Sequence, residues 1–170
     1  SGEIGGLVED ADGGLWVGTG KFTLHYLSVS GNLSEQNTFR RIKPPLPPNA
    51  PPAFGNEDML GKIICDRFDN NKLWIGCRYG VYHFNRKTEI FTFFPFDKPI
   101  EKTSFSPKNV SLLQDNQGRI WCGGLNSGVL KLDPKSGLWR HLSKPASEIY
   151  DAVDNTIYNF EMLDSQQVLA

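Results

Sequence analysis

A short segment with tryptophan in its second place and glycine in its fourth recurs three times along the chain. The copies are Leu15–Gly18, Leu73–Gly76 and Ile120–Gly123, and each follows a turn rich in Asp, Asn or Gly. Repeats of roughly 40–50 residues are typical of propeller blades, in which one supersecondary unit is copied along the chain. We therefore expect a repeat protein with one structural unit for each of these three tryptophans.

Each unit predicts four short strands. The first strand is predicted at Ile4–Glu9, Lys62–Arg67 and Asn109–Gln114, and the Trp-Gly segment is the second. The third strand alternates apolar, basic and apolar residues in Leu24–Tyr26, Tyr82–Phe84 and Leu130–Leu132. The fourth strand ends in aromatic and apolar residues, the first of which is Phe39, Phe91 or Trp139.

Four antiparallel strands in each unit indicate an all-β chain, a β-propeller fragment of about three and a half four-stranded antiparallel blades. Blade 1 is predicted at about 1–43, blade 2 at about 59–98 and blade 3 at about 106–144, with a proline-rich linker at about 44–58. A fourth blade starts at about 155–170.

Because propellers close with about four to eight blades, we expect this sequence to be a piece of a longer protein whose remaining blades complete the ring. Open blade edges invite pairing with other chains. The alternative is a homodimer through these open edges, which would contain about seven blades.

The composition excludes several classes of protein. With 39% hydrophobic and 12% aromatic residues, the chain has enough apolar side chains to form a folded core. A net charge of −1, with both signs mixed along the chain, provides no basic surface, so no nucleic acid partner is expected for this fragment. No segment approaches the roughly 18–20 apolar residues of a membrane-spanning helix.

Cysteines and histidines do not predict a cofactor or metal site. Cys65, Cys77 and Cys122 are odd in number and form no CxxC motif, so buried free thiols are favoured, with a Cys65–Cys77 bridge left open. His25 and His83 are interpreted as one exposed basic position on the third strand of successive blades.

The turns and the remaining motifs give no sign of chemistry. Asp10, Asp12 and Gly13 have some similarity to a calcium loop, but a hairpin turn capped by its own side chains accounts for them. The sequence has no nucleophile elbow, no glycine-rich phosphate loop and no distinctive carboxylate pair. No catalytic residue is therefore predicted.

Ligand-binding candidates are instead sought in the loops between the second and third strands, which open on the face of a propeller that usually binds ligands. These candidates are Lys21, Arg78, Tyr79, Asn126 and Ser127. Cationic, amide and aromatic side chains suit a sugar, although the same residue types also occur in ordinary loops. The long linkers around Phe54, Phe105 and Tyr150 open on the same face.

Two other segments depart from the repeat. The proline-rich run Lys43–Phe54 predicts a stiff connection between blades 1 and 2, either a simple tether or a wall of a ligand site. The phenylalanines crowding the fourth strand of blade 2 are expected to pack against neighbouring blades rather than another chain. These are Phe91, Phe93, Phe94 and Phe96.

The combined pattern resembles the two-component regulator propeller repeat, in which Asp precedes Gly, Leu or Ile, Trp and a second Gly at fixed spacing. Blade 1 supplies Asp10, Gly13, Leu15, Trp16, Gly18 and Thr19. Blade 3 matches best, through Val110, Leu113, Asp115, Gly118, Ile120, Trp121, Gly123, Gly128, Leu130, Leu132 and Asp133. Blade 2 departs, with Phe68 in the place of Asp and Asn71 in the place of Gly, and blade 4 has Leu169 in the place of Trp.

This resemblance implies the periplasmic sensor region of a hybrid two-component histidine kinase, anchored in the inner membrane. Such a region would bind an oligosaccharide and control glycan-utilisation genes, with no chemistry in the fragment itself. A protein-interaction propeller scaffold and a propeller-fold carbohydrate-active enzyme are the alternatives. In all three cases the repeated residues are structural: Trp16, Gly18, Trp74, Gly76, Trp121 and Gly123.

Overall fold

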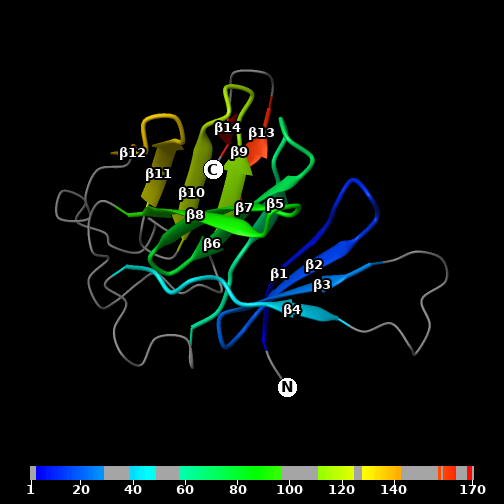
Figure 1. Cartoon of the computed structure of the whole chain (residues 1–170). Helices are drawn as coiled ribbons and strands as arrows, with labels where there is room; N and C mark the ends of the chain where they lie inside the picture. Colours follow the sequence, from blue (N-terminus) through cyan, green and yellow to red (C-terminus); the bar gives the residue numbers. More distant parts are fainter. Residues whose placement is uncertain are drawn as a thin grey trace.

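The computed structural model describes residues 3–28, 39–48, 58–96, 111–124, 128–142, 157, 159–163 and 168–169. These residues form three four-stranded antiparallel sheets and one two-stranded pair, joined by turns and loops (Figure 1). Strands follow one another in sequence order within each large sheet, as in the blades of a propeller. The all-β fold predicted from the repeat is therefore confirmed.

The strands of each blade have the following bounds. Blade 1 contains β1 (Ile4–Glu9), β2 (Leu15–Thr19), β3 (Thr23–Leu27) and β4 (Arg40–Ile42). Blade 2 contains β5 (Ile63–Cys65), β6 (Lys72–Cys77), β7 (Gly80–Asn85) and β8 (Ile90–Pro95). Blade 3 contains β9 (Ser111–Gln114), β10 (Ile120–Gly124), β11 (Gly128–Asp133) and β12 (Leu138–His141).

The first strands agree with their predicted positions to different extents. β1 has the predicted bounds, whereas β5 is shorter than the predicted Lys62–Arg67 because its ladder ends at the Cys65–Leu73 pair. β9 is described from Ser111, and Asn109 lies outside the described residues. In the region of the fourth blade, β13 (Glu161–Met162) pairs antiparallel with β14 (Val168–Leu169).

Antiparallel strand order places the connections of every blade at two opposite ends. The β1–β2, β5–β6, β9–β10 and β11–β12 turns lie at one end, called here the turn face (Figure 1). The β2–β3 and β6–β7 hairpin loops lie at the other end, called here the loop face. The innermost strands β1, β5 and β9 neighbour one another, so the blades lie side by side.

The hydrophobic core is divided between two blade interfaces. Between blades 1 and 2, the buried cluster includes Trp16, Leu24, Ile63, Tyr82 and Phe84. Between blades 2 and 3 it includes Trp74, Val81, Leu112, Ile120 and Leu132. Both buried tryptophans thus pack toward the blade that follows, so burial of the repeat residues holds neighbouring blades together.

The phenylalanines of blade 2 contribute to both interfaces, as the sequence predicts. Phe91 and Phe93 pack against the core shared with blade 1, and Phe93 lies 4.5 Å from Tyr82 between ring centroids. Phe94 and Phe96 pack against the core shared with blade 3, where Phe96 lies 4.9 Å from Trp139. The two pairs use opposite faces of the chain at β8 because side chains alternate along a strand.

In blades 1 and 3 the glycine two residues after the tryptophan leaves room for the segment that leads into the next blade. A Cβ on Gly18 would lie 3.0 Å from the Cβ of Leu60, just before β5. A Cβ on Gly123 would lie 2.6 Å from the Cβ of Ile157, at the entry to the fourth unit. Real Cβ atoms essentially never approach to 2.6 Å, and a contact of 3.0 Å is tighter than nine in ten real ones. The repeat therefore needs glycine at these places for packing between blades.

Part of the proline-rich linker lies against blade 2. Tyr82 Oη donates a hydrogen bond to the carbonyl of Pro45 at 2.7 Å, and Pro44 and Pro47 are buried. Further along, Phe22 N donates to the Asp58 carbonyl at 3.0 Å. Residues 49–57, including Phe54, lie outside the described residues. The described part of the linker therefore packs on blade 2, and its role as a tether or as a wall of a ligand site stays a prediction.

The register of blade 2 excludes a Cys65–Cys77 disulfide. Cys65 pairs with Leu73, which places Cys77 four residues further along β6. Four residues of strand span about 13 Å, well beyond the roughly 7 Å between Cα atoms that a disulfide tolerates. All three cysteines are free, with Cys77 and Cys122 buried and Cys65 half-buried.

Candidate functional site

Each blade carries the same hydrogen bond from tryptophan to aspartate, called here the Asp–Trp clamp. Trp16 Nε1 donates to Asp10 Oδ2 at 2.6 Å, Trp74 Nε1 to Asp66 Oδ2 at 2.8 Å, and Trp121 Nε1 to Asp115 Oδ2 at 2.8 Å. The three aspartates are buried. A buried carboxylate needs such partners because its desolvation is otherwise unfavourable.

The second oxygen of each clamp aspartate organises the turn that leads into the second strand. Asp10 Oδ1 accepts hydrogen bonds from the backbone N–H groups of Asp12 and Gly14, both at 2.9 Å. Asp115 Oδ1 accepts from Gln117 and Arg119, also at 2.9 Å. The calcium-like spacing at Asp10 is thus accounted for by a capped hairpin turn.

Blade 2 keeps the clamp, contrary to the sequence comparison that placed Phe68 in the position of Asp. Its aspartate is Asp66, eight residues before Trp74 rather than six. Asp66 Oδ1 accepts from the backbone N–H groups of Phe68 and Asp69 at 2.9 and 3.2 Å. The turn is two residues longer, and Phe68 lies in it with 64% of its surface exposed.

The third strands also align differently from the prediction. Trp16 pairs with Tyr26, Trp74 with His83 and Trp121 with Lys131, whereas His25 pairs with Val17. His25 and His83 therefore do not occupy equivalent positions. The shift arises because the β2–β3 loop has one more residue than the β6–β7 loop, and it includes Lys21 and Phe22 at φ values of 59° and 51°.

His83 is not an exposed basic residue but part of the clamp of blade 2. Its ring stacks on Trp74 with centroids 3.9 Å apart and an angle of 7°. Its Nε2 hydrogen-bonds to Asp66 Oδ2 at 3.0 Å, and 20% of its side chain is exposed. Burial alone would raise the pKa of Asp66, but the hydrogen bonds from His83, from the Phe68 backbone and from Trp74 lower it to about 2.

Arg86 joins the turn faces of blades 1 and 2. From the β7–β8 turn its Nη1 donates to Asp10 Oδ2 at 2.5 Å and its Nη2 to Asp12 Oδ2 at 3.0 Å. It also donates to the Asn70 carbonyl, and only 10% of its side chain is exposed. Arg86 thus fills the boundary between these two blades at the turn face.

Blade 3 has no arginine at the corresponding place. Phe84 pairs with Leu73, just before Trp74, and Leu132 pairs with Ile120, just before Trp121, so Phe84 and Leu132 occupy corresponding positions. Two residues further along the chain, Arg86 therefore corresponds to Pro134. Proline has no charged or hydrogen-bonding side chain that could reach the clamp of blade 2. The boundary between blades 2 and 3 is accordingly open at the turn face.

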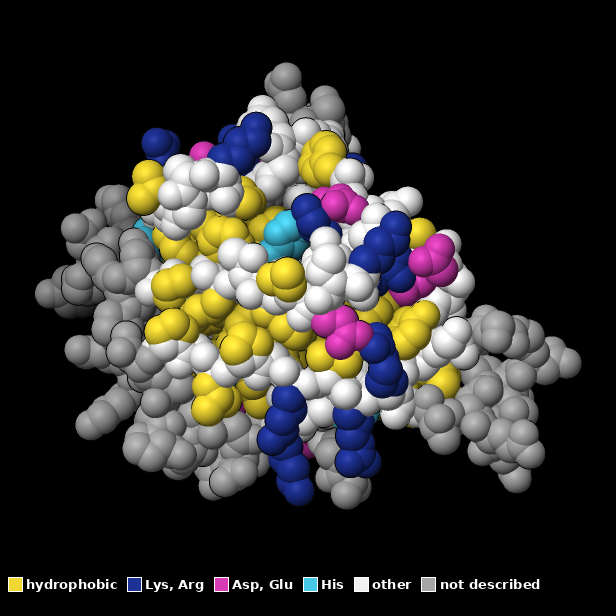
Figure 2. Space-filling view, in the orientation of Figure 1, with side chains coloured by type: hydrophobic (Ala, Val, Ile, Leu, Met, Phe, Trp, Pro, Cys, Tyr) yellow, Lys and Arg dark blue, Asp and Glu magenta, His cyan; other side chains and the backbone are white. Residues whose placement is uncertain are grey.

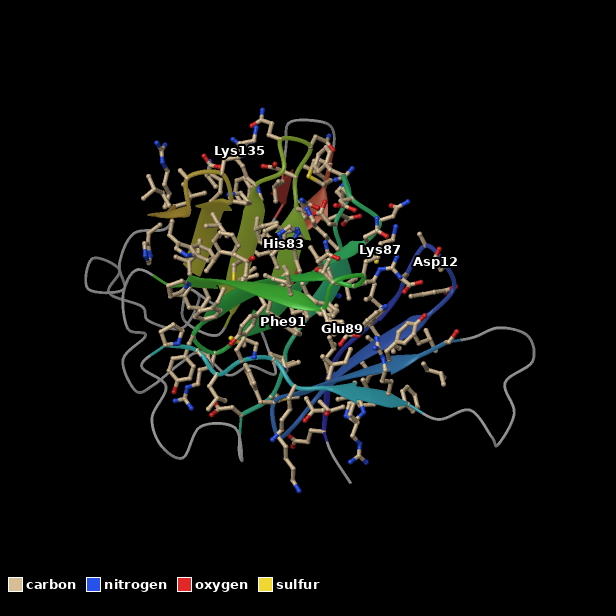
Figure 3. All side chains as sticks on the ribbon, in the orientation of Figure 1. Asp12, His83, Lys87, Glu89, Phe91 and Lys135 are labelled. Carbon is tan, nitrogen blue, oxygen red and sulfur yellow. The ribbon has the colours of Figure 1, made fainter. Side chains whose placement is uncertain are left out.

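This opening is a cleft of about 670 Å³, called here the turn-face cleft. Its lining combines the clamp of blade 2 with turns from both blades, and Figure 3 labels two of its residues, His83 and Lys135. In Figure 2 a histidine is visible on this side of the molecule, between hydrophobic and basic side chains. The residues are Asp66, Phe68, Asp69, Lys72, Trp74, His83, Gln114, Asn116, Gln117, Gly118, Arg119, Asp133, Pro134 and Lys135.

Most charges in the cleft already have partners. Lys72 Nζ lies 3.1 Å from Asp69 Oδ2, and Arg119 Nε lies 2.6 Å from Asp115 Oδ2. In the same lining, Gln114 Oε1 accepts a hydrogen bond from the Arg67 backbone N–H at 2.7 Å, which links blades 2 and 3. The cleft therefore presents fixed donors and acceptors without a large excess of either charge.

The sequence-predicted binding residues that the structure describes lie on the loop face, and their role stays a prediction. Lys21 and Arg78 are exposed, and Tyr79 is half-buried. Arg78 Nη1 lies 3.7 Å from Asp58 Oδ1, and its guanidinium lies 5.9 Å from the centre of the Tyr79 ring. Asn126 and Ser127 lie outside the described residues, as do Phe105 and Tyr150.

Two negative findings apply to the described ranges. They contain no group of three or more His, Cys, Asp or Glu side chains arranged to hold a metal ion. They also contain no helix with the length and apolar character needed to cross a membrane.

Comparison with known proteins supports the propeller architecture. Residues 1–21 match the family model described as two component regulator propeller. No curated protein sequence matches the chain. Solved structures, in contrast, match most of it.

Two of these are structures of the extracellular domain of BT4673 from B. thetaiotaomicron, described as a one component system in one and a hybrid two component system in the other. They have TM-scores of 0.61 and 0.63 at 18% identity and cover 93% of this chain. A third, the extracellular domain described as that of the hybrid two component system BT3049 from the same organism, has a TM-score of 0.62 at 16% identity and covers 97%.

This chain spans only 18%, 19% and 21% of the length of those three structures, which therefore contain much more than the blades seen in this chain. The Asp–Trp clamp, the glycine after the tryptophan and the strand order recur in the three blades. The family match covers β1, β2 and the clamp of blade 1. The chain thus carries the two component regulator propeller repeat in residues 1–21 and has the fold of part of a propeller from the extracellular domain of such signalling systems.

Proposed function

We propose that this chain is part of the extracytoplasmic sensor of a hybrid two-component histidine kinase. The observation that carries the proposal is the combination of the regulator propeller repeat in residues 1–21 with a fold shared with extracellular domains of such systems. The proposed location is the periplasm, and the proposed parent protein spans the inner membrane.

The proposed ligand is an oligosaccharide released by breakdown of a glycan. Its binding would favour one arrangement of the sensor over another, and the kinase would respond to that arrangement across the membrane. A ligand shifts such an equilibrium only by its difference in affinity for the two states. This chain contributes binding and packing surface, with no chemical step assigned to it.

Further blades of the same protein are the proposed partners of the exposed apolar side chains of β1. Ile4 is 68% exposed and Leu7 is 59% exposed. Exposed apolar side chains of this size commonly mark contact surfaces. A homodimer through the blade edges stays a prediction, and the mass of the chain measured by sedimentation distinguishes it from a monomer.

The direct test uses the longer protein in membrane vesicles. Phosphate incorporation is measured in the presence of a panel of oligosaccharides from plant, algal and host glycans. The proposal expects one class of saccharide to change the rate of phosphorylation. If no saccharide changes the rate while the kinase is active, or if the longer protein has no kinase region, the proposal is wrong.

A further inference from the structure

We infer that the turn-face cleft between blades 2 and 3 is a binding site for a neutral sugar residue. This inference rests on the proposed saccharide-sensing function and assigns it to a place that the loop-face predictions do not include. It is carried by the contrast between two adjacent blade boundaries. The first boundary is filled by Arg86, and the second is left open by Pro134.

The open boundary is unexpected for packing alone. Arg86 bridges Asp10 and Asp12 of the neighbouring blade, which satisfies a buried carboxylate and adds contacts between blades. At the corresponding boundary His83, from the same blade as Asp66, provides the second partner of that carboxylate. Asp66 therefore needs no cation from blade 3, and the space beside Trp74 and His83 stays accessible.

The shape of the cleft fits one or two sugar rings. Its volume of about 670 Å³ falls in the range of small-molecule sites, which run from roughly 300 to 1,000 Å³. Its floor is rigid because Trp74 is 1% exposed and is held by both the clamp and the His83 stack. A rigid floor reduces the entropy that a ligand must overcome on binding.

Phe68 supplies the aromatic surface that a pyranose ring requires. It lies on the cleft wall, 64% exposed, in the turn that is two residues longer than its counterpart in blade 1. An exposed phenylalanine in a polar turn contributes nothing to the core. Aromatic rings interact favourably with apolar faces laid against them, and a pyranose presents such a face in its C–H groups.

The polar groups of the cleft suit hydroxyls better than an anion. Lys72 and Arg119 are paired with Asp69 and Asp115, so each has a nearby carboxylate that would repel an anionic ligand. Lys135 and Asp133, both exposed, place one donor and one acceptor side by side on the β11–β12 turn. A sugar hydroxyl both donates and accepts hydrogen bonds and therefore matches such mixed groups.

The test is calorimetric titration of the whole chain with neutral tetrasaccharides of glucose, xylose, mannose and galactose, and with tetragalacturonate as the acidic probe. At least one neutral probe is expected to bind. Phe68→Ala should weaken it roughly tenfold, which corresponds to about 1.4 kcal/mol. Ile90→Ala, at an exposed residue that does not line the cleft, should leave the affinity unchanged.

A matched pair of variants at Pro134 tests the cleft itself. Pro134→Arg places a guanidinium where Arg86 stands in the preceding blade, so it should fill the cleft and abolish sugar binding. Pro134→Ala removes the proline without filling the space and should retain binding. Thermal melting of each variant establishes that it is folded before the comparison is made.

Several results would overturn the inference. Binding that survives Phe68→Ala and Pro134→Arg but is lost in Arg78→Ala or Tyr79→Ala places the site on the loop face and leaves the proposed sensor function intact. Binding of tetragalacturonate alone contradicts the neutral-sugar assignment. Absence of binding by every probe at millimolar concentration also overturns it, whereas the phosphorylation assay on the longer protein decides the sensor function separately.

Discussion

Arg86 of blade 2 forms an ion pair with Asp10 of blade 1, and the two side chains are only 10% and 1% exposed. The same aspartate oxygen accepts the indole hydrogen bond of Trp16. One carboxylate therefore connects the clamp that recurs in each blade with the contact between two blades. Disrupting this pair should destabilise both.

Replacing Arg86 by methionine should lower the free energy of unfolding by about 3 kcal/mol, because it leaves a buried carboxylate without its cation. Urea denaturation followed by tryptophan fluorescence measures the loss. Arg40→Met is the matched control, since Arg40 and Glu89 pair at the surface with 50% and 46% exposure. Exposed pairs contribute about 0–1 kcal/mol, so equal losses in the two variants would contradict this role of Arg86.

Because of the clamp of blade 2, the free energy of unfolding should depend on pH in the acidic range. Asp66 has a pKa of about 2 in the folded protein against a usual value of 3.8. Its contribution is therefore present above about pH 4 and is lost as the pH falls through the folded-state pKa near 2, and it amounts to about 2 kcal/mol. Asp66→Asn should be less stable at pH 7 and should lose less stability between pH 4 and pH 2.

Urea denaturation of wild type and Asp66→Asn at several pH values in that interval provides the comparison. Glu89→Gln is the control, because Glu89 pairs with Arg40 at the surface, where the two side chains are 46% and 50% exposed. Parallel stability curves for wild type and Asp66→Asn would show that the clamp does not depend on the carboxylate charge.

Gly123, two residues after Trp121, should be intolerant of alanine. Gly123→Ala brings a Cβ within 2.6 Å of Ile157 Cβ, and overpacking of this kind costs typically 1–3 kcal/mol. In Gly20→Ala the new Cβ would meet only Glu3 N at 3.9 Å, an ordinary contact. Thermal melting should therefore show a clear loss of stability for Gly123→Ala and little change for Gly20→Ala. Similar melting of the two variants would mean that the fourth unit does not pack against Gly123.

All three cysteines should be free but slow to react. Burial raises the pKa of Cys77 to about 12 and also raises the pKa values of Cys65 and Cys122. Thiolates are the reactive form, so alkylation at pH 8 should be slow for Cys77 and Cys122 in the native protein and complete in urea. Mass spectrometry counts the modified thiols. A species two hydrogens lighter that resists alkylation in urea would indicate a disulfide and would contradict the register of β5 and β6.

Sequence alone predicted the elements that depend on local pattern. The tryptophan repeat located the sheets because alternation, turn residues and glycine are read directly from neighbouring positions. The alignment of the repeats was wrong where a loop or turn differs in length between blades. Two additional residues in the β5–β6 turn concealed Asp66 as the clamp residue, and one additional residue in the β2–β3 loop made His25 look equivalent to His83.

The turn-face cleft was beyond sequence reasoning for a different reason. Its existence depends on contacts between blades, in which Arg86 and Pro134 occupy corresponding places. Nothing local to Pro134 distinguishes it from any other turn proline. One signal was present in the sequence, because an exposed Phe68 in a turn has no role in the repeat, but its interpretation required the position of Asp66 to be known.

Three equivalent blades are each held by an Asp–Trp clamp, including blade 2. Nuclear magnetic resonance of the chain labelled with ¹⁵N-tryptophan tests it directly, because each indole N–H gives its own signal. The clamp predicts slow hydrogen exchange for the indoles of Trp16 and Trp74, and Asp66→Asn should shift and deprotect the Trp74 signal while leaving Trp16 in place. An unchanged Trp74 signal in Asp66→Asn would contradict the assignment of Asp66 as the clamp of blade 2.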